Sequence, residues 1–406
     1  MEYTFIEGGV CAPKGFSAGG VHAGIRKNPQ KKDLALIYSD TECNATAVYT
    51  KNKVKGAPLT VTARHLEDGK ARAILCNSGN ANTCNSDGEF IAESMCKSAA
   101  AAVGADESDI IIASTGVIGQ PLPLEPIISS MEALKASLSK NGSKDAAEAI
   151  MTTDTRRKEE ALSFELGGKT CSIGAIAKGS GMIHPNMATM LCFMTTDVAI
   201  SSELLKEACR EAADESFNMI SVDGDTSTND MFVIMASGAA GNALINERGE
   251  DYDIFKAGLI KLSKKMAKML AADGEGATKL LECNVEGCPD RETARKVAKS
   301  VICSNLFKAA MFGKDANWGR ILCAIGYTEG DFDVSPIDVS LSSESGTVLV
   351  CKKGAGVPFS EEEALKILDK PEIKINVNMN QGNEKATAWG CDLTYDYVKI
   401  NGDYRT

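Results

Sequence analysis

The chain has 406 residues, of which 44% are hydrophobic and 24% are charged, and its formal net charge is -11. This composition is ordinary for a soluble globular protein, and the negative charge argues against a general nucleic-acid binder, which normally carries a basic face. No apolar run approaches the ~20 residues of a membrane span, and the amino terminus lacks the basic and then apolar regions of a secretory signal, so we expect a cytoplasmic protein.

Short apolar runs bounded by turn residues predict strands, and apolar residues three and four apart predict helices. In chain order we expect strands over residues 45–50 and 73–76, a helix over 91–102, a strand over 110–113, a helix over 204–212, a strand over 231–236, a helix over 259–270 and a strand over 373–379. This mixture indicates an α+β fold in which sheets pack against helices.

Two further elements are expected near the carboxy terminus. Ser360 followed by Glu363 has the spacing of a capping box, which predicts the start of a helix that runs to Leu368. The alternation of Leu393, Tyr395 and Tyr397 predicts a strand that carries the last residues.

The 14 cysteines lie singly along the chain, and the three histidines are far apart. Zinc sites usually show tighter cysteine pairs backed by histidine, so we expect no metal site. Most of the cysteines are therefore interpreted as small buried hydrophobic residues in a reducing compartment.

The most informative stretch places the small residue Ala188 before Thr189, which is followed by an apolar run from Met190 to Met194. A cut between Ala188 and Thr189 would give Thr189 a free α-amino group, which can act as the base for its own hydroxyl. The alternative is a threonine at the edge of an ordinary strand. A strand after the extended approach through Pro185 would hold Thr189 in place while its side chain faces a cleft.

Acyl transfer also requires an oxyanion hole. Thr115 and Gly116 directly follow the apolar strand expected over 110–113, and a glycine lets the backbone approach a ligand closely. The alternative is a simple turn from strand to loop.

Three more polar residues have ordinary structural interpretations. Lys178, before a Gly-Ser-Gly turn, could be a solvated loop charge, although such a cation could also bind a carboxylate. Thr152 could be a helix or turn cap, and Glu275, between two glycines, could be an exposed acid.

Two other features are interpreted as structural. The run that starts at Asp223 resembles the opening of a calcium loop, but Thr228 stands where that loop requires glycine, so we expect a turn held by short polar side chains. The lone His184 near the cut is also expected to be structural.

The stretch from Lys178 to Leu191 resembles the cleavage-site signature of the ornithine acetyltransferase family, the bifunctional glutamate N-acetyltransferases of arginine biosynthesis. Further segments resemble the same family in the same order over nearly the whole chain: residues 15–21, 77–82, 113–119, 221–230, 274–279, 312–320 and 389–394.

The resemblance implies a layered α/β sandwich that resembles the amino-terminal-nucleophile hydrolases in mechanism, with a smaller carboxy-terminal domain that we place from residue 286, after a main domain of 1–285. It also implies that the precursor cuts itself into an α fragment, residues 1–188, and a β fragment, residues 189–406. The two fragments would stay together as a heterotetramer of two α and two β fragments.

By the same resemblance, Thr189 is the nucleophile, and Thr115 and Gly116 form the oxyanion hole. The positions that contact substrate are Thr152, Lys178, Thr189, Glu275, Asn401 and Thr406. The reaction would transfer the acetyl group of N-acetylornithine to glutamate through a threonine ester, with no metal or organic cofactor. Whether acetyl-CoA is a second donor stays open at this point.

Two alternative functions remain. A related amidase or aminopeptidase would use the same self-cleaved nucleophile and give its acyl group to water, because fold alone does not separate transfer from hydrolysis. A catalytically silent ligand-binding protein would stay whole after purification.

Overall fold

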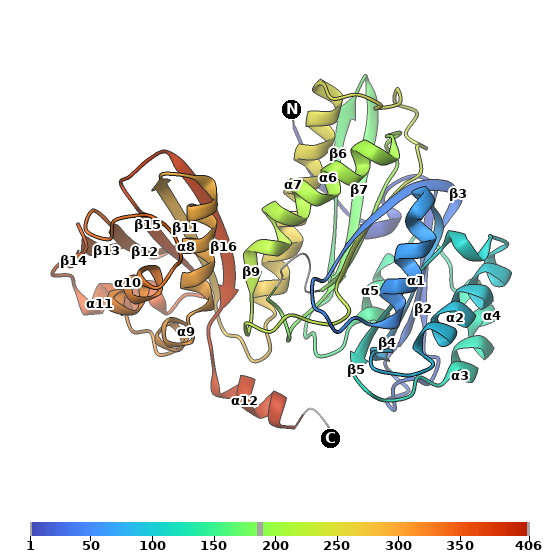
Figure 1. Cartoon of the computed structure of the whole chain (residues 1–406), viewed down its shortest axis with the longest axis horizontal. Helices are drawn as coiled ribbons and strands as arrows, with labels where there is room; N and C mark the ends of the chain where they lie inside the picture. The colour runs from blue at the N-terminus through green and yellow to red at the C-terminus, as the bar shows by residue number, and fades with distance from the viewer. Residues whose placement is uncertain (1, 185–189, 404–406) are drawn as a thin grey trace. The chain divides into compact units, whose positions relative to one another are not determined.

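The structure is a computed structural model that describes residues 2–184 and 190–403. The chain divides into two compact units (Figure 1). Unit 1 comprises residues 1–179, 185–218 and 226–266, and unit 2 comprises residues 180–184, 219–225 and 267–406. The chain therefore passes from one unit to the other near the expected cut and again in the 219–225 segment.

The described residues of unit 1 form a mixed nine-stranded sheet in the order β1-β6-β7-β8-β10-β3-β4-β5, with β2 paired to β3. Most pairs are antiparallel, but β8 runs parallel to β10 and β4 runs parallel to β5. The strands are β1 (Thr4–Ile6), β2 (Phe16–Val21), β3 (Leu34–Tyr49), β4 (Lys70–Asn80), β5 (Ile110–Val117), β6 (Lys158–Leu166), β7 (Lys169–Lys178), β8 (Leu191–Thr196) and β10 (Met231–Ala236).

Helices complete unit 1, and the last of them, α7, continues from Ala267 into the long final segment of unit 2. They are α1 (Ala57–His65), α2 (Gly88–Val103), α3 (Leu124–Ser129), α4 (Met131–Ala136), α5 (Ser143–Ile150), α6 (Ser202–Glu215) and α7 (Glu250–Ala272). The predicted helical positions Ile91, Met95, Ala99 and Ala102 all point into the core from α2.

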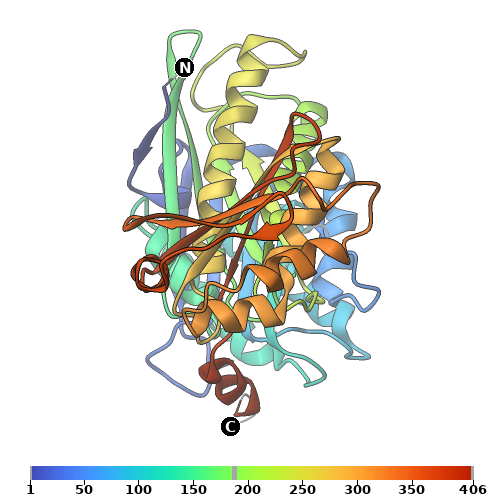
Figure 2. The same ribbon diagram turned by 90° about the vertical axis from the view of Figure 1, so that its left-hand side faces the viewer.

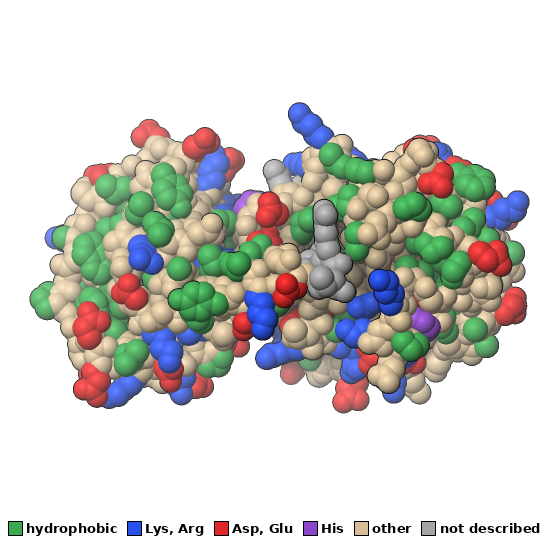
Figure 3. Space-filling model, turned by 90° about the horizontal axis from the view of Figure 1, so that it is seen from below, with side chains coloured by type: hydrophobic (Ala, Val, Ile, Leu, Met, Phe, Trp, Pro, Cys, Tyr) green, Lys and Arg blue, Asp and Glu red, His purple; other side chains and the backbone are tan. Residues whose placement is uncertain are grey.

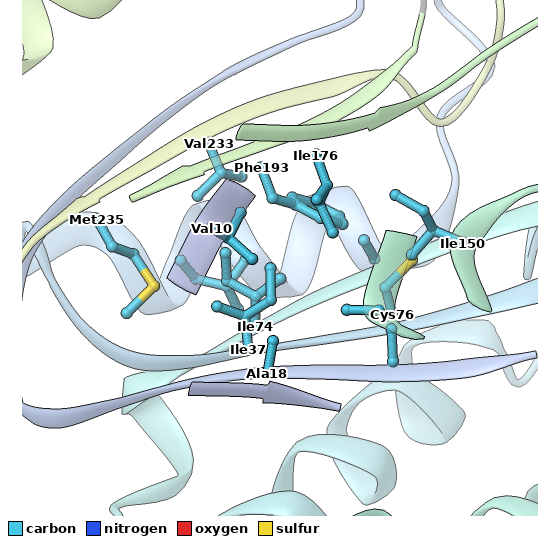
Figure 4. Packing of buried hydrophobic residues seen from close by; sticks show 14 of the residues in the cluster. Val10, Ala18, Ile37, Ile74, Cys76, Ile150, Ile176, Phe193, Val233 and Met235 are labelled. Carbon is cyan, nitrogen blue, oxygen red and sulfur yellow. The ribbon is translucent and has the colours of Figure 1, made fainter. Parts of the chain in front are cut away.

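The main core of unit 1 lies between two layers of strands (Figure 4). Ile37 and Ile74 come from β3 and β4 in one layer, and Phe193 and Val233 come from β8 and β10 in the other. A second core packs the other face of β3, β4 and β5 against α2, α3 and α4. Burial of these apolar side chains is the dominant stabilising contribution.

Unit 2 contains a seven-stranded sheet within the described residues, in the order β14-β13-β12-β15-β11-β16-β9. Helix α8 packs against β11 and β16, and α11 packs against β12 and β13 (Figure 2). Its elements are β9 (Ile220–Ser221), β11 (Leu280–Cys288), α8 (Arg291–Cys303), α9 (Asn305–Phe312), α10 (Trp318–Gly326), β12 (Asp338–Ser343), β13 (Gly346–Lys352), β14 (Ala355–Gly356), α11 (Glu361–Leu368), β15 (Glu372–Asn378), β16 (Glu384–Cys391) and α12 (Tyr395–Gly402).

The predicted α+β layers are confirmed, and so is the helix after Ser360, whose hydroxyl accepts the N–H of Glu363. The strand predicted through Tyr395 and Tyr397 is wrong, because this segment forms helix α12. The Thr394 hydroxyl caps that helix by accepting the N–H of Tyr397. Glu286, where we placed the smaller domain's start, lies inside β11, and the last crossing into unit 2 comes earlier, at Ala267.

The cysteines are all free, and all except Cys84, Cys303 and Cys323 are buried. Among residues 2–184 and 190–403, no group of His, Cys, Asp and Glu side chains could hold a metal ion, and no helix could span a membrane. Acidic and basic side chains are interspersed on the face shown in Figure 3.

Candidate functional site

Lys178 and Thr115 meet in unit 1 at the ends of two strands. Lys178 is the last residue of β7, and its Nζ donates to Oγ1 of Thr115 near the end of β5 at 3.3 Å. Both residues are buried, so Lys178 is not a solvated loop charge. Because the Thr115 hydroxyl accepts this hydrogen bond, its own proton remains available for donation to another group.

Gly116 sits where two backbones are in contact. Its φ is +136°, a conformation that favours glycine, and a Cβ at this position would overlap the carbonyl carbon of Gly79. Gly79 is the register partner of Gly116 in the parallel pair β4–β5. The glycine is therefore required by a close backbone approach beside Thr115.

A buried carboxylate that the sequence analysis missed supports this corner of unit 1. Asp154 Oδ1 accepts from Lys158 Nζ and from the Gly179 N–H, both at 2.6 Å, and Oδ2 accepts the N–H of Thr152 at 3.0 Å. Burial alone would raise the pKa of Asp154, but the cations Lys178 and Lys158 and the Gly179 hydrogen bond lower it to about 2. Asp154 thus holds the backbone of Thr152 and that of Gly179, the residue after Lys178.

Replacing Asp154 with asparagine should lower the midpoint of thermal unfolding, because it leaves the buried Lys158 cation without this carboxylate. Breaking a buried ion pair from one side typically costs about 3–5 kcal/mol. The double variant with Lys158→Met removes both charges and should recover part of the loss. An unchanged midpoint for Asp154→Asn in calorimetry would contradict this role.

The same ion pair gives a pH dependence with a definite sign. The folded pKa of Asp154 lies below its ordinary value of 3.8. Its contribution to stability is therefore complete above about pH 4 and is lost as the pH falls through about 2.

A second buried carboxyl group, also missed, stands directly before β10. Burial raises the pKa of Asp230 well above its ordinary value, and hydrogen bonds from Ser227 and Thr50, together with the charge of Lys178, only partly oppose this. Its Oδ2 has no hydrogen-bond partner in the described part of the chain. The next residue, Met231, donates its N–H to the carbonyl of Met190 at 2.9 Å. Asp230 therefore lies beside the strand end that follows the expected cut.

Glu275 and Asn401 meet in unit 2. Asn401 Nδ2 donates to Oε2 of Glu275 at 2.8 Å, and the Glu275 carboxyl group lies where a Cβ on Gly181 would be. Glu275 is buried, so it is not the exposed acid of the alternative interpretation. The backbone N–H of Glu275 donates to the carbonyl of Ser180 at 3.0 Å. The structure thus joins these two predicted substrate contacts to the segment that precedes the expected cut.

The side chain of Asp223 anchors that same segment within unit 2. It accepts the N–H groups of Met182 at 2.6 Å and Ile183 at 2.9 Å, which supports a structural turn. His184 Nδ1 lies 3.1 Å from the Ser221 hydroxyl, and burial lowers the pKa of His184 to about 4. A neutral, hydrogen-bonded imidazole fits the predicted structural role.

The predicted residues Ala188, Thr189 and Thr406 lie outside the described residues. Described residues resume at Met190, and β8 begins with Leu191, which is in register with Lys178 on β7 and Met231 on β10. Thr189 thus precedes, by two positions in the sequence, the strand that lies between β7 and β10.

Comparison with known proteins extends the resemblance over the whole chain. Residues 17–406 match the ArgJ family. The "Arginine biosynthesis bifunctional protein ArgJ" of Caldanaerobacter subterraneus subsp. tengcongensis is 49% identical over 402 residues, which are 99% of each chain. That of Bacillus subtilis is 45% identical over 403 residues, 99% of this chain and 97% of the relative. A crystal structure of ArgJ from Bacillus halodurans is 45% identical with a TM-score of 0.50, and covers 52% of this chain and 98% of the solved chain.

Proposed function

The chain belongs to the ArgJ family, and from that premise we propose that it transfers the acetyl group of N-acetylornithine to glutamate in arginine biosynthesis. Because its relatives are named bifunctional, the proposal includes acetyl-CoA as a second acetyl donor for glutamate. The observation that carries the proposal is the buried hydrogen bond from Lys178 to Thr115, beside Gly116, because Lys178 ends β7, which pairs with β8, the strand that follows Thr189.

In the proposed reaction, Thr189 Oγ attacks the acetyl carbonyl and passes its proton to its own α-amine. The Thr115 hydroxyl and the Gly116 N–H stabilise the oxyanion. Collapse of the tetrahedral intermediate breaks the amide bond, and ornithine leaves with the proton. The amine of glutamate then attacks the threonine ester, takes the acetyl group and frees Thr189 again. The scheme requires no metal or organic cofactor.

The substrate contacts follow from charge. Lys178 suits the α-carboxylate of the bound amino acid, since it is a cation beside the proposed oxyanion hole. Glu275 suits the side-chain ammonium of ornithine, and Asn401 orients its carboxylate through the 2.8 Å hydrogen bond. Thr152, whose backbone is held by Asp154, and the terminal Thr406 complete the proposed set.

We also propose that the precursor cuts itself between Ala188 and Thr189 and that the fragments stay together. Strand β7, before the cut, pairs along Ile173–Lys178 with β8, after the cut, which supports lasting association. Nearly all of the solved chain from Bacillus halodurans aligns with about half of this chain. This match supports processing into two fragments. A heterotetramer of two α and two β fragments and a cytoplasmic location are part of the proposal.

One assay tests the function. Purified protein is incubated with N-acetylornithine, with and without glutamate, and N-acetylglutamate is quantified by mass spectrometry. We expect N-acetylglutamate only with glutamate present, and a second series with acetyl-CoA should also yield it. Equal acetate release with and without glutamate would instead establish the amidase. Treatment with a chelator should leave the rate unchanged.

Replacing Asn401 with alanine should raise the KM for N-acetylornithine by roughly tenfold, because a hydrogen bond to a charged group contributes about 1.5–3 kcal/mol. Self-cleavage should survive, since it depends on local geometry around Thr189. Deletion of Arg405 and Thr406 probes the end of the tail by the same kinetics. Wild-type kinetics in both variants would exclude the tail from substrate binding.

A further inference from the structure

Arg26 is a cation of unit 1 that takes no part in the proposed acetyl transfer from N-acetylornithine. It lies in the loop between β2 and β3, whose shape is fixed by the fully buried carboxylate of Asp33. Asp33 accepts the N–H of Ala23 at 2.5 Å and the N–H of Arg26 at 2.8 Å. The backbone position of Arg26 is therefore well determined, although it belongs to a loop.

The side chain of Arg26 extends from this loop to the proposed oxyanion corner. Its Cγ is 2.9 Å from where a Cβ on Gly79 would be, so its stem crosses the glycine that pairs with Gly116. Its guanidinium donates from Nη1 to the carbonyl of Met151 at 2.8 Å and from Nη2 to the carbonyl of Thr152 at 3.4 Å. Arg26 thus joins Gly79, beside the oxyanion corner, to the Thr152 turn.

Two other cations of this corner, Lys158 and Lys178, already have carboxyl groups as neighbours. Lys158 is paired with Asp154 at 2.6 Å, and the charge of Lys178 interacts with both Asp154 and Asp230. Arg26, in contrast, has no carboxylate within ion-pair distance anywhere in residues 2–184 and 190–403. A guanidinium has five donors, and the two carbonyl contacts leave the others available.

We propose that Arg26 binds the side-chain carboxylate of the acceptor glutamate. This inference rests on the proposed function and explains how one enzyme uses two amino acids of opposite side-chain charge. Ornithine and glutamate share an α-amine and an α-carboxylate, and Lys178 can bind the α-carboxylate of either amino acid. Glu275 suits the side-chain ammonium of ornithine but would repel the side-chain carboxylate of glutamate. A guanidinium has the charge and the planar, bidentate geometry that match a carboxylate.

The test separates the two halves of the reaction in the self-cleaved wild type and in Arg26→Gln. Formation of the acetyl-enzyme from N-acetylornithine alone is followed by the mass increase of the β fragment, and acetyl transfer is followed at varied glutamate. For Arg26→Gln we expect a KM for glutamate about 10- to 100-fold higher, as for a lost charged hydrogen-bond pair, with the rate of acetyl-enzyme formation unchanged.

Three controls make the result specific. Lys27→Gln removes the same charge from the neighbouring exposed residue and should leave both steps unchanged. Arg26→Lys keeps the charge and should recover part of the affinity for glutamate. Glutamine is a neutral acceptor of the same shape. The wild type should strongly prefer glutamate to glutamine as acceptor, and Arg26→Gln should show a much smaller preference.

Two outcomes would overturn the assignment. A glutamate KM within twofold of wild type would show that Arg26 does not bind the acceptor. An equal loss in both half-reactions would show that Arg26 only supports the Thr152 turn. Wild-type protein that forms the acetyl-enzyme but never acetylates glutamate would refute the proposed function itself. This outcome needs no variant, so it is distinct from a failure of the Arg26 assignment.

Discussion

Replacing Thr189 with alanine should leave the 406-residue chain uncut and abolish acetyl transfer. The alanine has no hydroxyl to attack the preceding carbonyl, so no fragment would begin with a free amine at this position. The same change removes the proposed nucleophile, and loss of a nucleophile has cost on the order of 10⁶ in turnover in a hydrolase. This is the largest effect that we expect from any single substitution.

Denaturing gels and intact-mass spectrometry measure the first half of this prediction. Wild-type protein should give fragments of residues 1–188 and 189–406, and Thr189→Ala should give one chain. Thr189→Ser keeps a hydroxyl and is the matched control, which should still be cut. Cleavage after Ala188 in the alanine variant would refute self-cleavage by Thr189.

Thr115→Ala should lower turnover by about 10²–10³ while the KM for N-acetylornithine changes little. Removal of one oxyanion-hole donor has this effect because the donor acts mainly on charge that develops in the transition state. The substitution also removes the acceptor of the 3.3 Å hydrogen bond from Lys178 Nζ. Steady-state kinetics on self-cleaved protein give both constants.

Thr115→Ser is the matched control, because its hydroxyl can still accept from Lys178 and donate to the oxyanion. It should retain most of the turnover, and the melting temperatures of both variants should stay close to that of the wild type. A turnover number unchanged in Thr115→Ala would remove Thr115 from the mechanism. A rise in KM alone would make it a substrate contact and not an oxyanion donor.

The main elements of both units could be predicted from local patterns. The run over residues 231–236 forms β10 with every residue buried, and the capping pair Ser360 and Glu363 starts α11. Both signals are strong because they are contained in a few neighbouring residues. The strand predicted for the tail was wrong because the alternation of its tyrosines is also a local pattern. The Thr394 cap starts helix α12 there, and α12 has no buried residue, so no packing against the core favours a strand.

The sequence by itself determined the α+β class, the family resemblance and the identities of the proposed site residues, since motifs such as Ser114-Thr115-Gly116 are local in the chain. Only the tertiary structure decided which of them meet. Lys178 and Thr115 are 63 positions apart, and Arg26 and Met151 are 125 apart. The buried carboxyl groups of Asp154 and Asp230 likewise had no local signal, because burial and the direction of a pKa shift depend on neighbours that strand pairing brings from distant parts of the chain.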